Sequence, residues 1–448
     1  MSHARRVSRR RFLEGAAAAV AAPTFIPAAA LGKDGRPAPS NRVVMGCIGV
    51  GWQGGGNMGR FLGFQDCQVV AIADVDAQHR QGAVDRVNKH YKDSGCKGYS
   101  DFRELTARPD IDAVMCACPD HWHALTSLSA LTQGKDVFGE KPISHKFVEG
   151  RAMADAQKKH GRIWQTGSWQ RSVFNFRYGV ELVHNGHIGK VKRVEIGLPS
   201  GHADFGRTGN NSPNGDPPAH LDYDFWIGPA QMEPYNRSRS HKNWRWNYNI
   251  GGGQLMDWIG HHCDIAHWGL SDTEYGIGPE AQLGPLTVAG SGEFPPKEAV
   301  WNTATKYRIE CKYPNDVEVV IAGGHGDIRG GTKWIGEDGK WVYVNRGKFE
   351  ASEKQWTKRK FDRGPKKAYL SDNHWRNFLD CIKSRKPSIT PAEVAHRSAT
   401  PGHLGLIAMI TGRKLTWDPK TETIANDAGA TALLRRDLRK PWRLDQFS

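Results

Sequence analysis

The chain has 448 residues, which is enough for two domains that each bury a hydrophobic core. Its hydrophobic fraction of 38% and mean hydropathy of −0.60 predict a soluble globular protein, and no apolar stretch reaches the length of a membrane-spanning helix. The net charge is +15, but Lys and Arg are spread along the chain rather than gathered in a stripe. We therefore expect no nucleic-acid partner and no stable membrane insertion.

Residues 1–40 have the composition of a targeting segment followed by a linker. The stretch Ser8–Leu13, SRRRFL, is a twin-arginine pattern, and the apolar run Gly15–Val20 after it is too short to span a bilayer. We expect this segment to direct export of the folded protein to the periplasm or beyond. The eight cysteines include no C-x-x-C pair, and folding before export would leave them reduced, so we expect no disulfide framework.

A glycine-rich turn follows the first predicted strand. The apolar run Arg42–Ile48 leads into GVGWQG at residues 49–54, and helical sequence comes next. In this setting the first glycine allows the tight turn, the second lets a pyrophosphate approach the backbone, and the third lets helix pack on strand. A second apolar strand, Val69–Ala73, ends at Asp74, whose carboxylate would accept the ribose hydroxyls and repel a 2′-phosphate. The sequence therefore predicts a dinucleotide site that favours NAD over NADP.

Helices and strands continue to alternate up to residue 165. We expect helices at Asp76–Tyr91 and Ala124–Gln133, and strands at Ile111–Ala117 and Asp136–Phe138. Such alternation predicts a doubly wound parallel sheet, so the fold class is α/β and residues 41–165 form a Rossmann-type NAD-binding domain.

Two predicted strand ends carry polar groups where a ligand of such a sheet would bind. The first is Pro119–His123, PDHWH, and the second is Glu140–Pro142, EKP. The Lys141–Pro142 bond could be cis, and a lysine fixed before that proline could point toward the nicotinamide. The candidate cofactor-binding residues are Gly49, Gly51, Trp52, Gln53, Gly54, Asp74, Pro119, Asp120, His123, Glu140 and Lys141.

From residue 166 the pattern changes to strands joined by short turns. The predicted strands are Val191–Leu198, Thr303–Tyr313, Val317–Ala322, Thr332–Ile335 and Trp341–Asn345. An Asp-Gly pair marks a hairpin between the last two. We expect residues 166–390 to form an α+β domain for substrate binding and oligomerisation, with a large, mainly antiparallel sheet open on one face. The loop 199–229 is long enough to be functional or to form an oligomer contact. Residues 391–448 would add a helix and an arm that packs back on the body.

The stretch Gly251–Trp268, GGGQLMDWIGHHCDIAHW, carries the strongest chemical signal. Its glycines precede a helical pattern that places Asp257, His261 and Asp264 on one face. A carboxylate one turn before a histidine is the layout of a general base with its helper. Metal ligation is the alternative interpretation, but the consecutive His261 and His262 point about 100° apart on a helix, so we expect no metal site.

These motifs together resemble the glucose–fructose oxidoreductase / inositol dehydrogenase / rhizopine catabolism (Gfo/Idh/MocA) family, and the resemblance covers residues 42–448. The family's G-G-G-x-L-x-D-x-G-x-H-x-x-D pattern is matched over Gly251–Asp264, except that its inner glycine is Ile259 here, with Gly260 one place later. The stretch Leu221–Pro229 is similar to the exported branch of that family.

The resemblance implies an NAD-dependent oxidoreductase of sugars or cyclitols, with Lys141, Asp257 and His261 as its catalytic residues. Oxidation of a carbinol requires loss of the hydroxyl proton as hydride leaves, and His261, with an ordinary pKa near 6.5, would take that proton. Lys141 would stabilise the developing alkoxide, and Asp257 would hold a neighbouring hydroxyl or the imidazole. Aromatic and polar groups near these residues would suit a sugar ring. The candidate substrate-binding residues are Trp169, Arg171, Trp244, Arg245, Trp246 and His262.

An exported enzyme has no pool of free NAD, so we expect a tightly bound cofactor and a cycle that ends redox-neutral. Hydride exchange between two sugars would satisfy this, and so would a glycoside-cleaving, lyase or epimerase reaction through a transient keto-sugar. A non-catalytic, cofactor-stabilised sugar-binding protein is a further alternative, against which the joint presence of Lys141, Asp257 and His261 argues. An uncovered sheet face commonly packs against a partner, so we expect a homodimer or homotetramer.

Overall fold

The computed structural model describes residues 37–202 and 212–447, and the chain from residue 43 onward packs as one compact unit. The twin-arginine pattern and the middle of the long loop, residues 203–211, lie outside the described residues. Among the described helices, none combines the length and the apolar character that crossing a bilayer requires.

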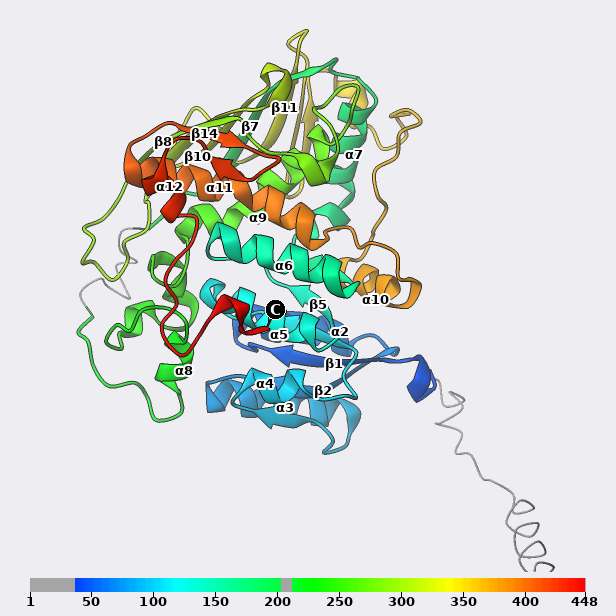
Figure 1. The fold of residues 1–448 in the computed structure, drawn as a ribbon. Coiled ribbons are helices and arrows are strands. Elements are labelled where there is room, and N and C mark those ends of the chain that lie inside the picture. Colours follow the sequence, from blue (N-terminus) through cyan, green and yellow to red (C-terminus); the bar gives the residue numbers. More distant parts are fainter. Residues whose placement is uncertain (1–36, 203–211, 448) are drawn as a thin grey trace, which may run out of the picture. The chain divides into compact units, whose positions relative to one another are not determined.

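A six-stranded parallel sheet with the strand order β3-β2-β1-β4-β5-β6 forms the N-terminal part of this unit (Figure 1). Its strands are β1 Val43–Ile48, β2 Cys67–Ala73, β3 Lys97–Tyr99, β4 Ala113–Cys116, β5 Asp136–Gly139 and β6 Trp164–Thr166. The chain winds outward from β1 in both directions, which is the doubly wound arrangement. In such sheets the ligand crevice lies outside the carboxyl ends of the central strands.

Both faces of this sheet are buried, which explains its continuous apolar strands. In β4, Ala113 and Met115 join one core, with helices α2, α3 and α10, while Val114 and Cys116 join the other core, with α4, α5 and α6.

The described helices are α2 Trp52–Leu62, α3 Ala77–Tyr91, α4 Phe102–Thr106, α5 His123–Thr132, α6 Phe147–His160, α7 Phe174–His184, α8 Tyr223–Ile227, α9 Gly253–Leu270, α10 His374–Ser384, α11 Ala392–Thr411 and α12 Ala428–Ala432.

The second sheet has nine strands in the order β13-β12-β11-β7-β10-β9-β8-β14-β15. Its strands are β7 Val191–Leu198, β8 Thr287–Glu293, β9 Lys306–Lys312, β10 Glu318–Gly323, β11 Gly331–Gly336, β12 Trp341–Asn345, β13 Lys348–Ala351, β14 Leu415–Asp418 and β15 Thr423–Ile424. Only the pair β7 and β10 is parallel among these described strands. The predicted fold class, a Rossmann sheet joined to a mainly antiparallel sheet, is confirmed.

Helix α9 lies at the centre of the molecule. It packs against β7, β11, α7 and α11, and Figure 1 shows α9 and α11 between the large sheet and α6. A helix that is apolar on all sides belongs in a core, and every residue of α9 is buried except Asp257 and Trp258 in its early turns. The one partly exposed corner of this helix is therefore the corner that carries the predicted catalytic carboxylate.

Several element bounds differ from the sequence expectation for identifiable reasons. The helix expected from Asp76 begins at Ala77, because the Asp76 carboxylate caps it by accepting from the backbone N–H of Gln78 and His79. The strand predicted third along the chain is β4 in the structure. Nothing in the sequence indicated β3, because it is a three-residue, largely exposed edge strand without an apolar run. Strands β7 and β12 have the predicted bounds, and the predicted hairpin joins β11 to β12.

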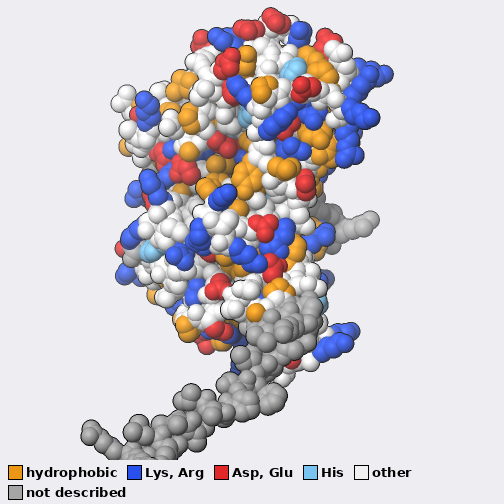
Figure 2. Space-filling model, turned by 90° about the vertical axis from the view of Figure 1, so that its right-hand side faces the viewer, with side chains coloured by type: hydrophobic (Ala, Val, Ile, Leu, Met, Phe, Trp, Pro, Cys, Tyr) orange, Lys and Arg blue, Asp and Glu red, His pale blue; other side chains and the backbone are white. Residues whose placement is uncertain are grey.

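Two later segments pack back against the N-terminal half of the chain. In the segment 212–250, Asp222 N–H donates to the carbonyl of Val75, and Ala77 N–H donates to that of His220. The C-terminal arm returns to the body, where Trp442 stacks on Phe225 with ring centroids 5.6 Å apart, and its red end lies beside α5 in Figure 1. All eight cysteines are free thiols. On the face drawn in Figure 2, Lys and Arg are interspersed with Asp and Glu.

Candidate active site

A cleft of about 430 Å³ lies at the carboxyl ends of β1, β2, β4 and β5, and α9 closes its far side. Its walls come from both halves of the chain. The first half supplies the glycine turn and the strand ends, and the second half supplies the start of α9 and residues of the segment 212–250. This is the crevice in which a doubly wound sheet binds its ligand.

The glycine turn has the geometry that the motif demands. Gly49 has φ of +75°, and a Cβ on it would lie 2.8 Å from the backbone of Ala117. A Cβ on Gly54 would lie 1.8 Å from the carbonyl oxygen of Gly49, so only glycine lets α2 pack here. Gly51 is the N-cap of α2 and supplies no side-chain cap, which leaves the first backbone N–H groups of this helix for an anion. Gly51 lines the cleft, whereas Gly54 lies behind it.

Asp74 is at the predicted strand end, with both of its carboxylate oxygens already engaged. One oxygen accepts from Val50 N–H at 2.8 Å and the other from Asp76 N–H at 3.0 Å. A carboxylate has about four acceptor positions, so ribose hydroxyls can still be bound. Burial raises the pKa of Asp74, while the two backbone N–H groups oppose that rise. With the glycine turn, these groups fit the ribose and pyrophosphate of a dinucleotide.

The polar strand ends brace this part of the cleft. The His123 ring nitrogens lie 2.7 Å from the Pro142 carbonyl and 2.8 Å from the Cys118 carbonyl. Glu140 accepts from the side chains of Gln53 at 3.1 Å and Asn57 at 2.8 Å, both on α2. Pro119, Asp120, Trp52 and the other predicted cofactor-binding residues except Gly54 all line the cleft.

Lys141 and Asp257 meet across the cleft. The Lys141 Nζ donates to Asp257 Oδ1 at 2.9 Å and to the Asp257 backbone carbonyl at 2.9 Å, and Arg245 Nε donates to the same Oδ1 at 3.0 Å. The Lys141–Pro142 bond is cis, as its sequence suggested. A Cβ on Gly260 would lie only 3.0 Å from the Cβ of Lys141. The shifted glycine of α9 therefore leaves space for the lysine.

His261 projects from α9 into the same cleft, one turn after Asp257. Its Nδ1 is buried and has no hydrogen-bond partner among the described residues. Burial lowers the pKa of His261 well below its ordinary value, and the charges of Lys141 and Arg346 add to this. Burial alone would raise the pKa of Asp257, but Lys141 and Arg245 outweigh it and hold that pKa well below its usual range. At neutral pH the cleft thus holds a neutral imidazole beside an ionised carboxylate.

The predicted substrate residues divide into two groups. Trp169, Trp244 and Arg245 line the cleft. Trp246 and His262 do not: Trp246 packs on Trp301, with ring centroids 5.1 Å apart, and His262 lies behind Trp258, on which it stacks with ring centroids 5.9 Å apart. Both residues are neighbours of cleft residues in the sequence, but their side chains point away from the cleft and are buried.

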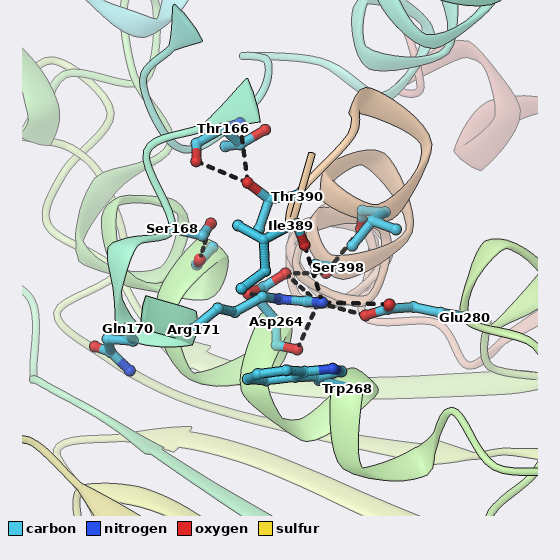
Figure 3. A network of polar contacts seen from close by, with 12 residues as sticks. Thr166, Ser168, Gln170, Arg171, Asp264, Trp268, Glu280, Ile389, Thr390 and Ser398 are labelled. Carbon is cyan, nitrogen blue, oxygen red and sulfur yellow. Dashed lines mark hydrogen bonds and ion pairs between the residues drawn. The ribbon is translucent and has the colours of Figure 1, made fainter. Parts of the chain in front are cut away.

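Arg171 is a correction to the sequence expectation. It lies outside the cleft and is 1% exposed, and its guanidinium donates to both oxygens of Asp264 at 2.6 and 2.8 Å. Figure 3 shows this pair within a network that includes Glu280 and Ser398, with the Trp268 ring beneath the guanidinium. Asp264 therefore fixes α9 to its neighbours, and the face of α9 predicted to carry chemistry does so only at Asp257 and His261.

Sequence reasoning missed several residues of the cleft. Arg346, at the turn between β12 and β13, and Trp258 on α9 line it beside His261. His79 and His241 line its other end, and with Asp76 they form the one described His/Asp group with donor atoms close enough to hold a metal, all within 4.8 Å of one another. Trp258 could have been predicted as a cleft residue, because it directly follows the predicted catalytic Asp257. Arg346 could not, because nothing in the sequence around it indicates that this hairpin turn borders the cleft.

A dinucleotide crevice combined with proton-transferring groups is the make-up of a nicotinamide-dependent dehydrogenase. The comparisons agree: residues 43–168 match the oxidoreductase-family NAD-binding Rossmann fold, and residues 177–444 match the oxidoreductase-family C-terminal alpha/beta domain. The chain belongs to the Gfo/Idh/MocA oxidoreductase family.

Individual relatives share about a third or less of their aligned residues with this chain, or match it in fold alone. Inositol 2-dehydrogenase of Salmonella typhimurium is 27% identical over 151 residues, 33% of this chain and 44% of that protein. The 2,7-anhydro-N-acetylneuraminate hydratase of Mediterraneibacter gnavus is 28% identical over 145 residues, 32% and 36% of the two chains. The matches thus span less than half of these relatives. The WlbA dehydrogenase of Bordetella pertussis, solved with NADH and UDP-GlcNAcA, shares the fold with a TM-score of 0.59 at 15% identity, covering 84% and 99% of the chains.

Proposed function

We propose that this oxidoreductase moves hydride between a tightly held NAD and a secondary hydroxyl of a sugar or cyclitol. One observation carries the proposal: Lys141, Asp257 and His261 line the same cleft as the glycine turn at residues 49–54. Inositol 2-dehydrogenase among the relatives supports the substrate class.

The residues divide the chemistry as follows. Bound NAD would supply the hydride acceptor at nicotinamide C4. Neutral His261 takes the hydroxyl proton, since its lowered pKa keeps the imidazole unprotonated at neutral pH. The Lys141 ammonium has three N–H donors, of which the two bonds to Asp257 use two, so the third can stabilise the developing alkoxide. Asp257 holds the ammonium in place and stays ionised because two cations contact it.

The preference for NAD over NADP rests on the acidic end of β2. The carboxylate of Asp74 lies beside the glycine turn, and Asp76 follows two residues later. A 2′-phosphate bound there would meet negative charge from both side chains, whereas ribose hydroxyls can donate to Asp74.

Export through the twin-arginine pattern and a redox-neutral cycle complete the proposal. The segment 212–250 supports tight cofactor binding, because it lines the cleft and is tied by backbone hydrogen bonds at Val75 and Ala77 to the turn that follows β2. We also propose a homodimer or homotetramer formed through the large sheet. Its face away from α9 presents paired charges, such as Arg193 and Lys312 with Glu318, that a second copy could cover.

A second candidate function is cleavage or hydration of a glycoside through a transient keto-sugar, with the cofactor restored in each cycle. The relative named as 2,7-anhydro-N-acetylneuraminate hydratase favours it. A non-catalytic sugar-binding role is less well supported, because a binding protein needs no unpaired, neutral imidazole beside a lysine at the cofactor cleft.

The test is to denature the purified protein and identify the released nucleotide and its redox state. We expect about one NAD or NADH per chain, and absorbance near 340 nm that changes when sugars and cyclitols are added to the native protein. Recovery of NADP would overturn the NAD assignment. Protein that carries no nucleotide and consumes added NAD stoichiometrically would overturn the redox-neutral cycle. A ligand that binds without any change at 340 nm would favour the binding protein.

A further inference from the structure

Arg346 reaches the substrate end of the cleft from outside the predicted site. It follows β12 at the hairpin turn, and its guanidinium carbon lies 4.7 Å from the ring centroid of Trp169 and 4.6 Å from that of Trp258. Those two indoles flank His261, with ring centroids 6.5 and 5.6 Å from the imidazole. The guanidinium is therefore next to the group that handles the proton.

The guanidinium is held in place from behind. Its Nε donates to Oε1 of Gln170 at 3.1 Å, and Gln170 is 1% exposed. A buried amide thus accepts from Nε, which leaves the end of the fork between the two terminal nitrogens for a ligand. Two indole faces and one fixed edge restrict the guanidinium to a single plane.

Arg346 has no carboxylate partner among the described residues, unlike the other cations at this end of the cleft. Lys141 and Arg245 both form ion pairs with Asp257. Within the described part of the chain, no carboxylate forms an ion pair with Arg346, and burial lowers its pKa while the more distant Asp257 opposes this. Arg346 is exposed at its hairpin turn, but its guanidinium lines the cleft, where a cation without a counter-ion can receive an anion.

We propose that Arg346 is the receptor for a carboxylate on the substrate, so that the enzyme acts on an acidic sugar such as a uronic acid. This inference rests on the proposed function and narrows its substrate class. A planar fork matches a carboxylate with two parallel N–H···O bonds, and the flanking indoles suit the apolar face of a pyranose. A phosphate monoester would bring up to two negative charges to this single unpaired cation.

The experiment compares matched acidic and neutral sugars on the purified holoenzyme. D-glucuronate is paired with D-glucose, and D-galacturonate with D-galactose. Affinity is measured by titration calorimetry, and reaction by absorbance near 340 nm. We expect at least one acid to bind about 10-fold or more tightly than its neutral partner. Arg346→Gln should weaken acid binding about 10- to 100-fold and bring the acid-to-neutral ratio close to one.

Two further variants separate this role from a general loss of structure. Arg346→Lys keeps the charge but removes the fork, and should restore only part of the preference. Arg443→Gln removes an exposed cation that pairs with Asp445 near the C-terminus, and should leave the preference unchanged.

Each remaining outcome decides the matter. Equal or tighter binding of the neutral sugars, or an unchanged ratio in Arg346→Gln, would overturn the acidic substrate while leaving the dehydrogenase proposal intact. Tighter binding of D-glucose 6-phosphate than of either acid would assign the site to phosphate and overturn the carboxylate. Acids that bind through Arg346 without any change at 340 nm would support the receptor and refute the redox function.

Discussion

Replacement of Arg171 by Met tests whether this arginine holds α9 or contacts substrate. Methionine has a similar length but no charge, so the variant leaves Asp264, which is 1% exposed, without its two strong donors. Among the described side chains, only the Ser398 hydroxyl at 3.1 Å then still donates to that carboxylate. Removing one partner of a buried ion pair costs about 3–5 kcal/mol. Glu280 adds little, because its side chain is 19% exposed and can turn to water.

Urea unfolding at pH 7 measures this cost. We expect Arg171→Met to lower the free energy of unfolding by about 3–5 kcal/mol, with little change in KM for the molecules that remain folded. The double variant Arg171→Met/Asp264→Leu removes both charges and should recover most of the stability, because no unpaired charge stays buried. If the free energy of unfolding of Arg171→Met lies within about 1 kcal/mol of the wild-type value while KM rises, this reasoning is refuted and Arg171 belongs to the substrate site.

Two other predictions follow from ionisable groups. His261→Ala should lower turnover about 10²- to 10⁴-fold, with the nucleotide still bound after gel filtration; unchanged turnover would remove His261 from the proton-transfer role. Burial lowers the pKa of His121, His267 and His403 to about 3, below the value near 6.5 in the unfolded chain. Their stabilising effect is complete above pH 6.5 and declines as pH falls, by about 1.4 kcal/mol per pH unit for each. Melting temperatures at pH 7 and pH 5 check this, and equal values would contradict it.

The fold was predictable where the sequence pattern is long or chemically demanding. The run Val43–Ile48 followed by the glycine turn admits one arrangement, because the Gly49 conformation and the Gly54 contact exclude other residues. Strand β8 was missed because its glycines and serine break the alternation expected of a strand, and its last residues are exposed. The short strands at the sheet edges, such as β15, have no apolar pattern to detect.

The site was predictable where residues belong to a recognisable motif, and not where the direction of a side chain decides whether it reaches the cleft. Lys141 and Asp257 are far apart in sequence, and it was the family resemblance that placed them in one site. Their ion pair was not foreseen, because Asp257 was expected to hold a hydroxyl or the imidazole. His262 is next to His261 but turns about 100° around α9 and is buried in the core. Arg346 could not be found, because its role depends on a hairpin folding back over the helix.

The segment 212–250 has a consequence for the modular construction of this enzyme. Phe225, Trp226 and Trp244 belong to the second half of the chain, yet they form walls of the cleft that the first half would need for a nucleotide. Residues 43–168 cut out alone would therefore expose an open trough. A chimera that joins residues 43–168 to the latter half of another enzyme would lose these walls, so the N-terminal half has to be transferred together with its own segment 212–250.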